Sequence, residues 1–587
     1  MAIANKQKRE SKFARRHYST AAKVFLILVL IIGVSFFVGS VRVVTATYGN
    51  YFTDGIGEHI SDESFMDPNA ERLDEYAAKF EQIVDLYHIP ENLTGDGWDY
   101  YLPIDVNFAD HAVYGNIHNA ADYLLYADPL DLDDPANQIQ SFGDPGHVAV
   151  YSGVSAIGDA FRYAVKKRDG EDLTNVTRRL YKLACAMNLM SDVTDDGGMV
   201  RWAIPDTPEA REYFGDGYFN ENKQGVHLKY STDYVGPNGK HYDFWCQTGT
   251  SMDCYLGVFN GLGMINALCD NATIKEITQE AIDRMLQYFV NNGWRFIDRD
   301  GKTHSMGSEA LTGSPIIDTG YALNFLRIGK TANLERWGDL YDQYAYDRLL
   351  SKKIGRHAQI GSLKLFAWQG GYFNINLAYS IAGPLCFMET DPVLKNYYQE
   401  HWLRELHDVS KYHRNAWFDV MYYLGMSDAD WSSSTSVMAV PDCSSIDEEW
   451  KELNEKSVSD SLLRLTYTKY PFRKFDWPYN FDSYSQKSTL DPIPDAPYPD
   501  LELYPWEEKV DTSNPIIKLA VDLFPFETVW DQPKPSDWRN TDPWIWEGSC
   551  FREIYVYARD VRAQSTPGSY TAPYWAARYL NYSTIAL

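Results

Sequence analysis

The amino-acid sequence predicts a mainly α-helical protein, arranged as an (α/α)6-type toroid of helical hairpins. Apolar residues recur at spacings of three and four in pairs of segments, and short acidic loops join the members of each pair. Such pairs follow one another over most of the chain, whereas the alternation typical of strands is scarce. Each hairpin must bury one face against its neighbours, and closing the series into a circle removes both exposed ends. We therefore expect six hairpins in a closed ring.

An apolar run near the N-terminus predicts one transmembrane helix, a signal-anchor over residues 24–41. Its length at the helical rise is about 27 Å, close to the thickness of a bilayer's hydrocarbon core. Residues 1–23 are rich in Lys and Arg, so the positive-inside rule predicts a basic cytoplasmic tail and an extracellular remainder. The alternative is a cleaved signal peptide, because residues 44–46 (Val-Thr-Ala) match a cleavage pattern. With an uncleaved signal-anchor, the protein is a single-pass protein of the cell membrane.

The part beyond the anchor divides into a stalk, a helical region and a C-terminal strap. Residues 42–67 form the polar stalk, and residues 68–470 carry the helical hairpins of the toroid. The first expected helix opens at residues 67–68 and carries apolar residues as far as Tyr87. The later ones are expected at 147–167, 172–190, 251–268, 274–292, 316–328, 334–350, 374–388 and 392–409. From residue 471 to 587, Pro, Trp, Tyr and Asp become dense and helical periodicity fades, which predicts an ordered aromatic strap completing the toroid. A last helix is expected at 574–582.

Composition narrows the class of partner. The formal net charge of −27 argues against nucleic acid or an anionic membrane surface, so the membrane is reached through the N-terminal helix only. The 43 Tyr and 17 Trp suit stacking against sugars, although they suit thick helical cores equally well. No P-loop, dinucleotide glycine pattern, GxSxG or HExxH is present, which disfavours nucleotide binding and serine-hydrolase chemistry.

Several loose motifs together resemble those of a known group. They lie at 146–153 (GHVAVYSG), 192–201, 248–253 (TGTSMD), 293–301 (GWRFIDRDG) and 573–579 (PYWAARY). In this combination the chain resembles, over about residues 95–583, a broad group of exported, largely uncharacterised proteins expected to form (α/α)6 toroids. That group is similar in shape to six-hairpin glycosidases and polysaccharide lyases. The resemblance implies the fold and brings no established reaction with it. The chain departs from the group's usual acid pair, because Cys254 follows Asp253.

Hydrolysis of a glycosidic bond requires two carboxylates that face the same bond. The catalytic candidates are Asp253, Glu547 and Asp318, since the sequence places each near the expected mouth of the ring. Asp253 enters the first turn of an apolar helix, where it could instead cap the helix or stabilise its dipole, and the same alternative holds for Asp318. Glu547 lies between Trp546 and Gly548, and its alternative role is a hydrogen bond from the strap to the ring.

The expected ligand is a glycan or polysaccharide. The residues proposed to contact it are Trp202, Trp245, Trp294 and Trp546 as sugar platforms, with Arg201, His241 and His147 as polar contacts. The leading hypothesis is a membrane-tethered, glycoside hydrolase-like enzyme. A second hypothesis is a non-catalytic envelope protein that binds glycan or protein, with its mouth filled by the strap. A third is a polysaccharide lyase, which would use a Tyr or His base and a cation beside a uronate.

No metal site or cofactor is predicted. The acidic segments 131–134 and 192–196 could hold calcium on oxygen ligands, but neither has the spacing of an EF-hand. Calcium therefore stays an alternative.

Overall fold

The computed structural model describes residues 60, 62–98, 103–108, 131–133, 138–143, 145–224, 227–297, 318–348, 350–352, 372–467, 472, 498–523, 528–539, 544–552 and 562–585. The predicted cytoplasmic tail and signal-anchor lie outside these residues. Within them, no helix combines the length and the apolar character that crossing a membrane requires.

The expectation of a mainly helical chain is confirmed. The principal helices are α2 (Ala70–Ile83), α4 (Val148–Asp169), α5 (Thr174–Asp192), α7 (Met252–Leu268), α8 (Ala272–Asn291), α9 (Asp318–Ala332), α10 (Leu334–Asp342), α13 (Tyr372–Met388), α14 (Pro392–Tyr398), α15 (Arg404–Ser410), α16 (Ala416–Met426), α17 (Glu448–Tyr467) and α20 (Gly568–Tyr579). Three further helices are α6 (Pro208–Phe214), α18 (Trp506–Lys509) and α19 (Pro515–Leu523). Between α14 and α15 the helix continues through a wider π-type segment, Gln399–Leu403. Helices α16 and α17 were not expected from the sequence.

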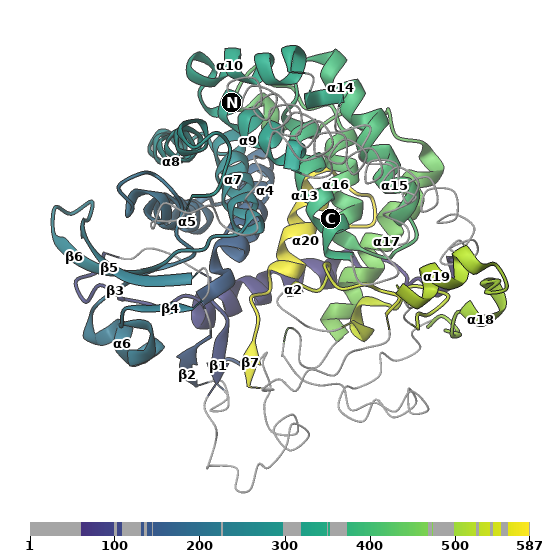
Figure 1. The fold of residues 1–587 in the computed structure, drawn as a ribbon, viewed down its shortest axis with the longest axis horizontal. Coiled ribbons are helices and arrows are strands. Elements are labelled where there is room, and N and C mark those ends of the chain that lie inside the picture. The colour runs from purple at the N-terminus through teal and green to yellow at the C-terminus, as the bar shows by residue number, and fades with distance from the viewer. Residues whose placement is uncertain are drawn as a thin grey trace, which may run out of the picture.

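Six helices pack against one another in a succession that returns to its start. Within the described residues, α4 packs on α7, α7 on α9, α9 on α13, α13 on α16, α16 on α20, and α20 on α4. Around them, α5 packs on α4, α8 on α7, α10 on α9, α17 on α16 and α2 on α20. Figure 1 shows the first set near the centre of the view and much of the second set further out. The first and last helices of the described chain, α2 and α20, therefore meet.

Hydrophobic character explains which helices lie inside. Helix α7 is buried from Cys254 to Leu268, and α16 is buried along its whole length. Helices that are apolar on all sides are stable only when neighbours surround them. The outer helix α10 buries one face, with Trp337, Gly338 and Tyr341, and exposes Leu334, Glu335, Arg336, Asp339 and Asp342 on the other.

Helices α4 and α7 approach each other closely because glycines lie at their crossing. A Cβ atom on Gly153 would lie 2.0 Å from the carbonyl oxygen of Gly257, and one on Gly261 would lie 2.9 Å from the Cα atom of Gly153. Any larger side chain would force the two backbones apart. This contact fixes the first turns of α4 and α7 relative to each other.

Two small antiparallel sheets accompany the helices and were not predicted. The larger has the order β3-β6-β5-β4, with β3 at Ala203–Pro205, β4 at Asn222–Gln224, β5 at His227–Val235 and β6 at His241–Gln247. The smaller has the order β2-β1-β7, with β1 at Val106–Phe108, β2 at Ile139–Phe142 and β7 at Ala563–Gln564. Residues along β6 alternate between more exposed and buried positions, so a two-residue alternation in the sequence marks this strand.

Candidate functional site

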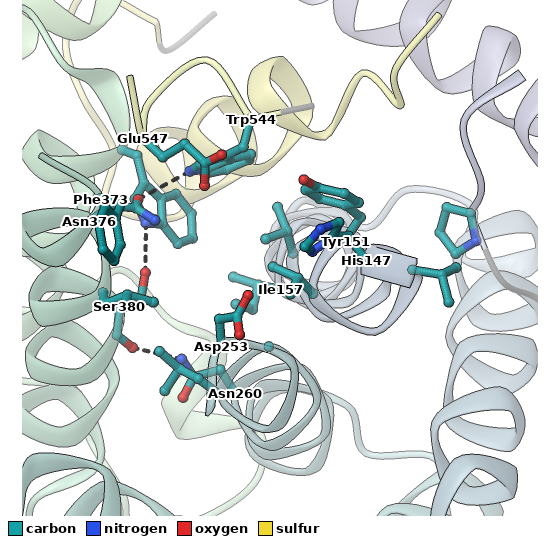
Figure 2. A pocket seen from close by; sticks show the side chains of 18 of the residues that line it. His147, Tyr151, Ile157, Asp253, Asn260, Phe373, Asn376, Ser380, Trp544 and Glu547 are labelled. Carbon is teal, nitrogen blue, oxygen red and sulfur yellow. Dashed lines mark hydrogen bonds between the residues drawn. The ribbon is translucent and has the colours of Figure 1, made fainter. Parts of the chain in front are cut away.

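A cavity of about 610 Å³ opens where several helices begin. Helices α4, α7 and α13 contribute their N-terminal turns to its wall. The segment before β1 also lines it, and the C-terminal segment 544–548, with Trp544 and Glu547 in Figure 2, completes it. A volume of this size falls in the range of small-molecule binding sites, roughly 300–1,000 Å³.

Two of the predicted catalytic carboxylates line this cavity together. Asp253 lies in the first turn of α7, and Glu547 belongs to the C-terminal segment. Figure 2 shows both carboxylates facing the same open space from different sides. The N-cap of α7 is Ser251, so Asp253 is not the capping residue, although its charge still suits the helix dipole. Both side chains are half-buried and within reach of a ligand.

The cysteine that follows Asp253 points into the protein. Cys254 is fully buried, with Ser251 Oγ at 3.3 Å from its sulfur. Burial raises the pKa of the Cys254 thiol to about 11, and the charge of Asp253 adds to this effect. The thiol is therefore neutral near pH 7 and is not a substitute for a second acid at this point.

Hydrogen bonds from three helices hold the segment that carries Glu547. The indole N–H of Trp544 donates to Asn376 Oδ1 on α13 at 3.1 Å, and Asn415, at the start of α16, donates to the carbonyl oxygen of Trp546 at 2.9 Å. The indole N–H of Trp546 donates to the carbonyl oxygen of Ser569 on α20 at 2.8 Å. Trp546, predicted as a sugar platform, is thus fully buried and anchors the segment. These bonds fix the backbone from which Glu547 extends.

His147 and Tyr151 form the side of the cavity that α4 contributes. His147 is the N-cap residue of α4 and is exposed, and Tyr151 lies one turn further, with ring centroids 6.4 Å apart. Arg201, predicted to bind substrate, does not line the cavity and is buried behind it. Its guanidinium donates to the carbonyl oxygen of Gly146 at 2.8 Å and to that of Gly249 at 3.4 Å. Arg201 therefore ties together the loops that precede α4 and α7.

Four other predicted site residues, Trp202, Trp294, His241 and Trp245, are not among the described residues that line this cavity. Trp202 is fully buried, and Trp294 is buried with its indole N–H bonded to the hydroxyl of Tyr344 at 2.8 Å. His241 is exposed on β6, and Trp245, also on β6, donates to the Asp206 carboxylate at 3.0 Å. Asp318 is the first residue of α9, and its side chain lies outside the described part.

Several lining residues were not proposed from the sequence. They are Asp105, Tyr151, Phe373, Asn376, Trp417 and Trp544, among others. Two of them stand within one helical turn or a short loop of a predicted residue, since Tyr151 follows His147 and Trp544 precedes Glu547. Phe373 is 51% exposed at the start of α13, which is unusual for an aromatic side chain on an inner helix.

The acidic segments considered for calcium show other contacts. Asp192 bonds to Arg284 at 2.8 Å, and Asp196 accepts a hydrogen bond from the backbone of Gly198 at 2.9 Å. Of the segment 131–134, only residues 131–133 belong to the described chain. Among the described residues, no group of three or more His, Cys, Asp or Glu side chains is arranged to hold a metal ion.

Comparisons with protein-family models, with curated proteins and with solved structures give no match to this chain.

Proposed function

We propose that the chain folds as an (α/α)6 toroid and hydrolyses a glycosidic bond in the cavity at the start of the inner helices. The cyclic packing from α4 through α7, α9, α13, α16 and α20 back to α4 supports the toroid, as does the outer partner beside most of these helices. In such a ring the mouth is formed by helix starts and loops, which is where the cavity lies.

The observation that carries the enzymatic proposal is the presence of Asp253 and Glu547 in one cavity. They come from distant parts of the sequence, so only the fold brings them to a common space. One carboxyl group would protonate the leaving oxygen, while the other would activate water or attack the anomeric carbon. Tyr151, Phe373 and Trp544 supply aromatic surface around them, which suits the apolar face of a sugar ring.

The alternatives receive less support from the same geometry. A purely structural or binding protein was expected to have its mouth filled by the C-terminal segment, whereas residues 544–548 form a wall of an open cavity. A lyase needs a cation beside the uronate carboxylate. Among the described residues that line the cavity, none is Lys or Arg, and three are Asp or Glu.

The place of action is part of the proposal. The predicted signal-anchor at 24–41 and the basic residues before it support a toroid held outside the cell membrane. A soluble or surface glycoside is then accessible to the cavity without transport.

The test is release of reducing sugar from a panel of glycosides and polysaccharides by the full-length protein. Asp253→Asn and Glu547→Gln should each lower kcat by about 100- to 10,000-fold, the usual contribution of general acid–base catalysis. The matched control is Asp233→Asn on β5, because that carboxylate is 64% exposed and lies outside the cavity lining. Turnover in Asp253→Asn and Glu547→Gln equal to that of Asp233→Asn would reject the assignment. For the active wild type, the anomeric configuration of the first product distinguishes retention from inversion.

A further inference from the structure

The cavity extends inward along the helices that form its wall. Each of three helices contributes one lining residue at its start and another two or three turns deeper. These pairs are His147 and Ile157 on α4, Asp253 and Asn260 on α7, and Phe373 and Ser380 on α13 (Figure 2). At the helical rise, they span about 10–15 Å along the helix axes. The cavity is therefore deep as well as open.

The chemical character of the wall changes with depth. The ionisable lining residues, Asp105, Asp253, Glu547 and His147, lie at helix starts or in the flanking segments. Beyond the first turns, aliphatic side chains line the wall together with the uncharged Asn260, Asn376 and Ser380. The aliphatic residues there are Val154, Ile157, Leu256 and Leu377, whereas Val148 and Val150 lie in the first turn of α4. Val150, Val154 and Leu377 stay half-buried although most of their neighbours on the same helices are fully buried. Their remaining exposed surface belongs to the cavity.

The polar groups deep in the cavity are bonded to one another. Asn260 donates to the carbonyl oxygen of Ser380 at 2.6 Å and accepts from Asn324 at 2.8 Å. The indole N–H of Trp417 donates to the Ser380 hydroxyl at 3.2 Å. A sugar ring at this depth would leave many of its hydroxyl groups without partners, which is unfavourable. An apolar group would meet aliphatic side chains there.

We propose that the substrate is a glycoside with an apolar, chain-like aglycone, whose sugar lies at the mouth and whose aglycone enters the aliphatic interior. This inference rests on the proposed function and specifies its substrate class. The sugar head is uncharged, because the carboxylates of Asp105, Asp253 and Glu547 would repel phosphate or sulfate. Cleavage would place the anomeric bond between the two catalytic carboxylates and leave the aglycone as the alcohol.

The experiment measures the binding of a homologous series, from methyl to hexyl glycosides of one sugar. The full-length protein is held in lipid nanodiscs, and titration calorimetry of empty discs is subtracted. Affinity should rise by up to about fourfold for each methylene group that becomes buried. Hexyl phosphate, which carries the same chain on an anionic head, should bind at least tenfold more weakly than the hexyl glycoside.

Val154→Phe tests where the chain lies, because a phenyl group at this position fills the interior. In this variant, affinity should stop rising at a shorter chain length than in the wild type. The matched control is Val235→Phe, since Val235 is 51% exposed on β5 and does not line the cavity. The affinity of Val235→Phe for the glycosides should rise with chain length as it does for the wild type.

The outcomes separate this inference from the proposed catalysis. Chain-length-dependent binding that Val154→Phe shortens, without any hydrolysis, would support the inference and reject the proposed enzyme. Hydrolysis of sugars with equal affinity for methyl and hexyl glycosides would overturn the inference and keep the enzyme. A rise with chain length that Val154→Phe leaves unchanged would also overturn it.

Discussion

Replacing Gly153 by alanine adds one methyl group where α4 and α7 cross. The new Cβ atom would lie 2.0 Å from the carbonyl oxygen of Gly257 and 2.7 Å from its Cα atom. Ordinary van der Waals contact begins at 3.4 Å, so the helices would have to separate by roughly 1.4 Å. The obstructing atoms belong to the backbone, and no rotamer change can remove them.

Two opposing terms set the expected loss of stability. Overpacking of a dense core costs about 1–3 kcal/mol, and the rigid backbone contact places Gly153→Ala at the upper end. Alanine regains about 1 kcal/mol through its higher helix propensity. The free energy of unfolding should therefore fall by about 2 kcal/mol. Asp253 lies one turn before Gly257, and a displacement of about 1 Å at a reacting group can lower turnover about 100-fold.

Thermal unfolding and turnover of Gly153→Ala, measured beside Gly217→Ala, test this reasoning. A methyl group on Gly217 would meet no atom within 4 Å, and the backbone there is not left-handed, so this variant should match the wild type. Gly153→Ala should melt at a lower temperature and turn over more slowly. Wild-type melting and turnover in Gly153→Ala would show that the crossing is not as close as described.

Two buried carboxylates give further predictions. Burial raises the pKa of Asp419 to about 8, so the folded protein keeps a proton that the unfolded chain loses near 3.8. Stability should fall as pH rises from about 4 to 8, and Asp419→Asn should raise the melting temperature more at pH 8 than at pH 4. An equal effect at both pH values would contradict this. Asp460 is buried, which disfavours its charge, but Arg414 and Arg464 lower its pKa below the usual range. Asp460→Asn removes the buried carboxylate that Arg414 and Arg464 share, although Arg464 keeps its ion pair with Asp537 at 3.5 Å. The substitution should cost about 3–5 kcal/mol in denaturant unfolding, whereas a wild-type midpoint would refute it.

Helical periodicity predicted most of the helices because apolar spacing is a local property of the chain. The π-type segment at Gln399–Leu403 was absorbed into one expected helix, since its five residues do not break the apolar pattern visibly. The sheet around β5 and β6 was missed for a different reason. Its strands β5 and β6, of nine and seven residues, lie in the polar stretch between two expected hairpins, where the sequence predicts a loop.

The two carboxylates in the cavity could be proposed because each stands at a recognisable boundary. Asp253 begins an apolar helix, and Glu547 lies in an aromatic segment without helical period. Tryptophan residues predicted the cavity lining less well than the carboxylates did. Trp202, Trp294 and Trp546 are buried, and the indole N–H groups of Trp294 and Trp546 have partners inside the protein. Sequence alone does not separate an indole in the core from one at a cavity wall, because both positions favour the same side chain.

The depth of the cavity follows from side-chain size as much as from the arrangement of helices. Asp253 in the first turn of α7, with Glu547 and His147 beside the helix starts, makes the mouth polar, while Val154, Ile157, Leu256 and Leu377 lie further along the inner helices. Whether that interior is open depends on a few positions. Val154 is small where a larger residue would fill the space, whereas Gly257 lets α7 approach α4, because a Cβ atom on it would lie 2.8 Å from the Cα atom of Val150. The glycine thus sets where Asp253 stands, and the valine sets how much room lies below it. Variation at Gly257 should therefore move the carboxylate, while variation at Val154 should change the size of the aglycone that fits.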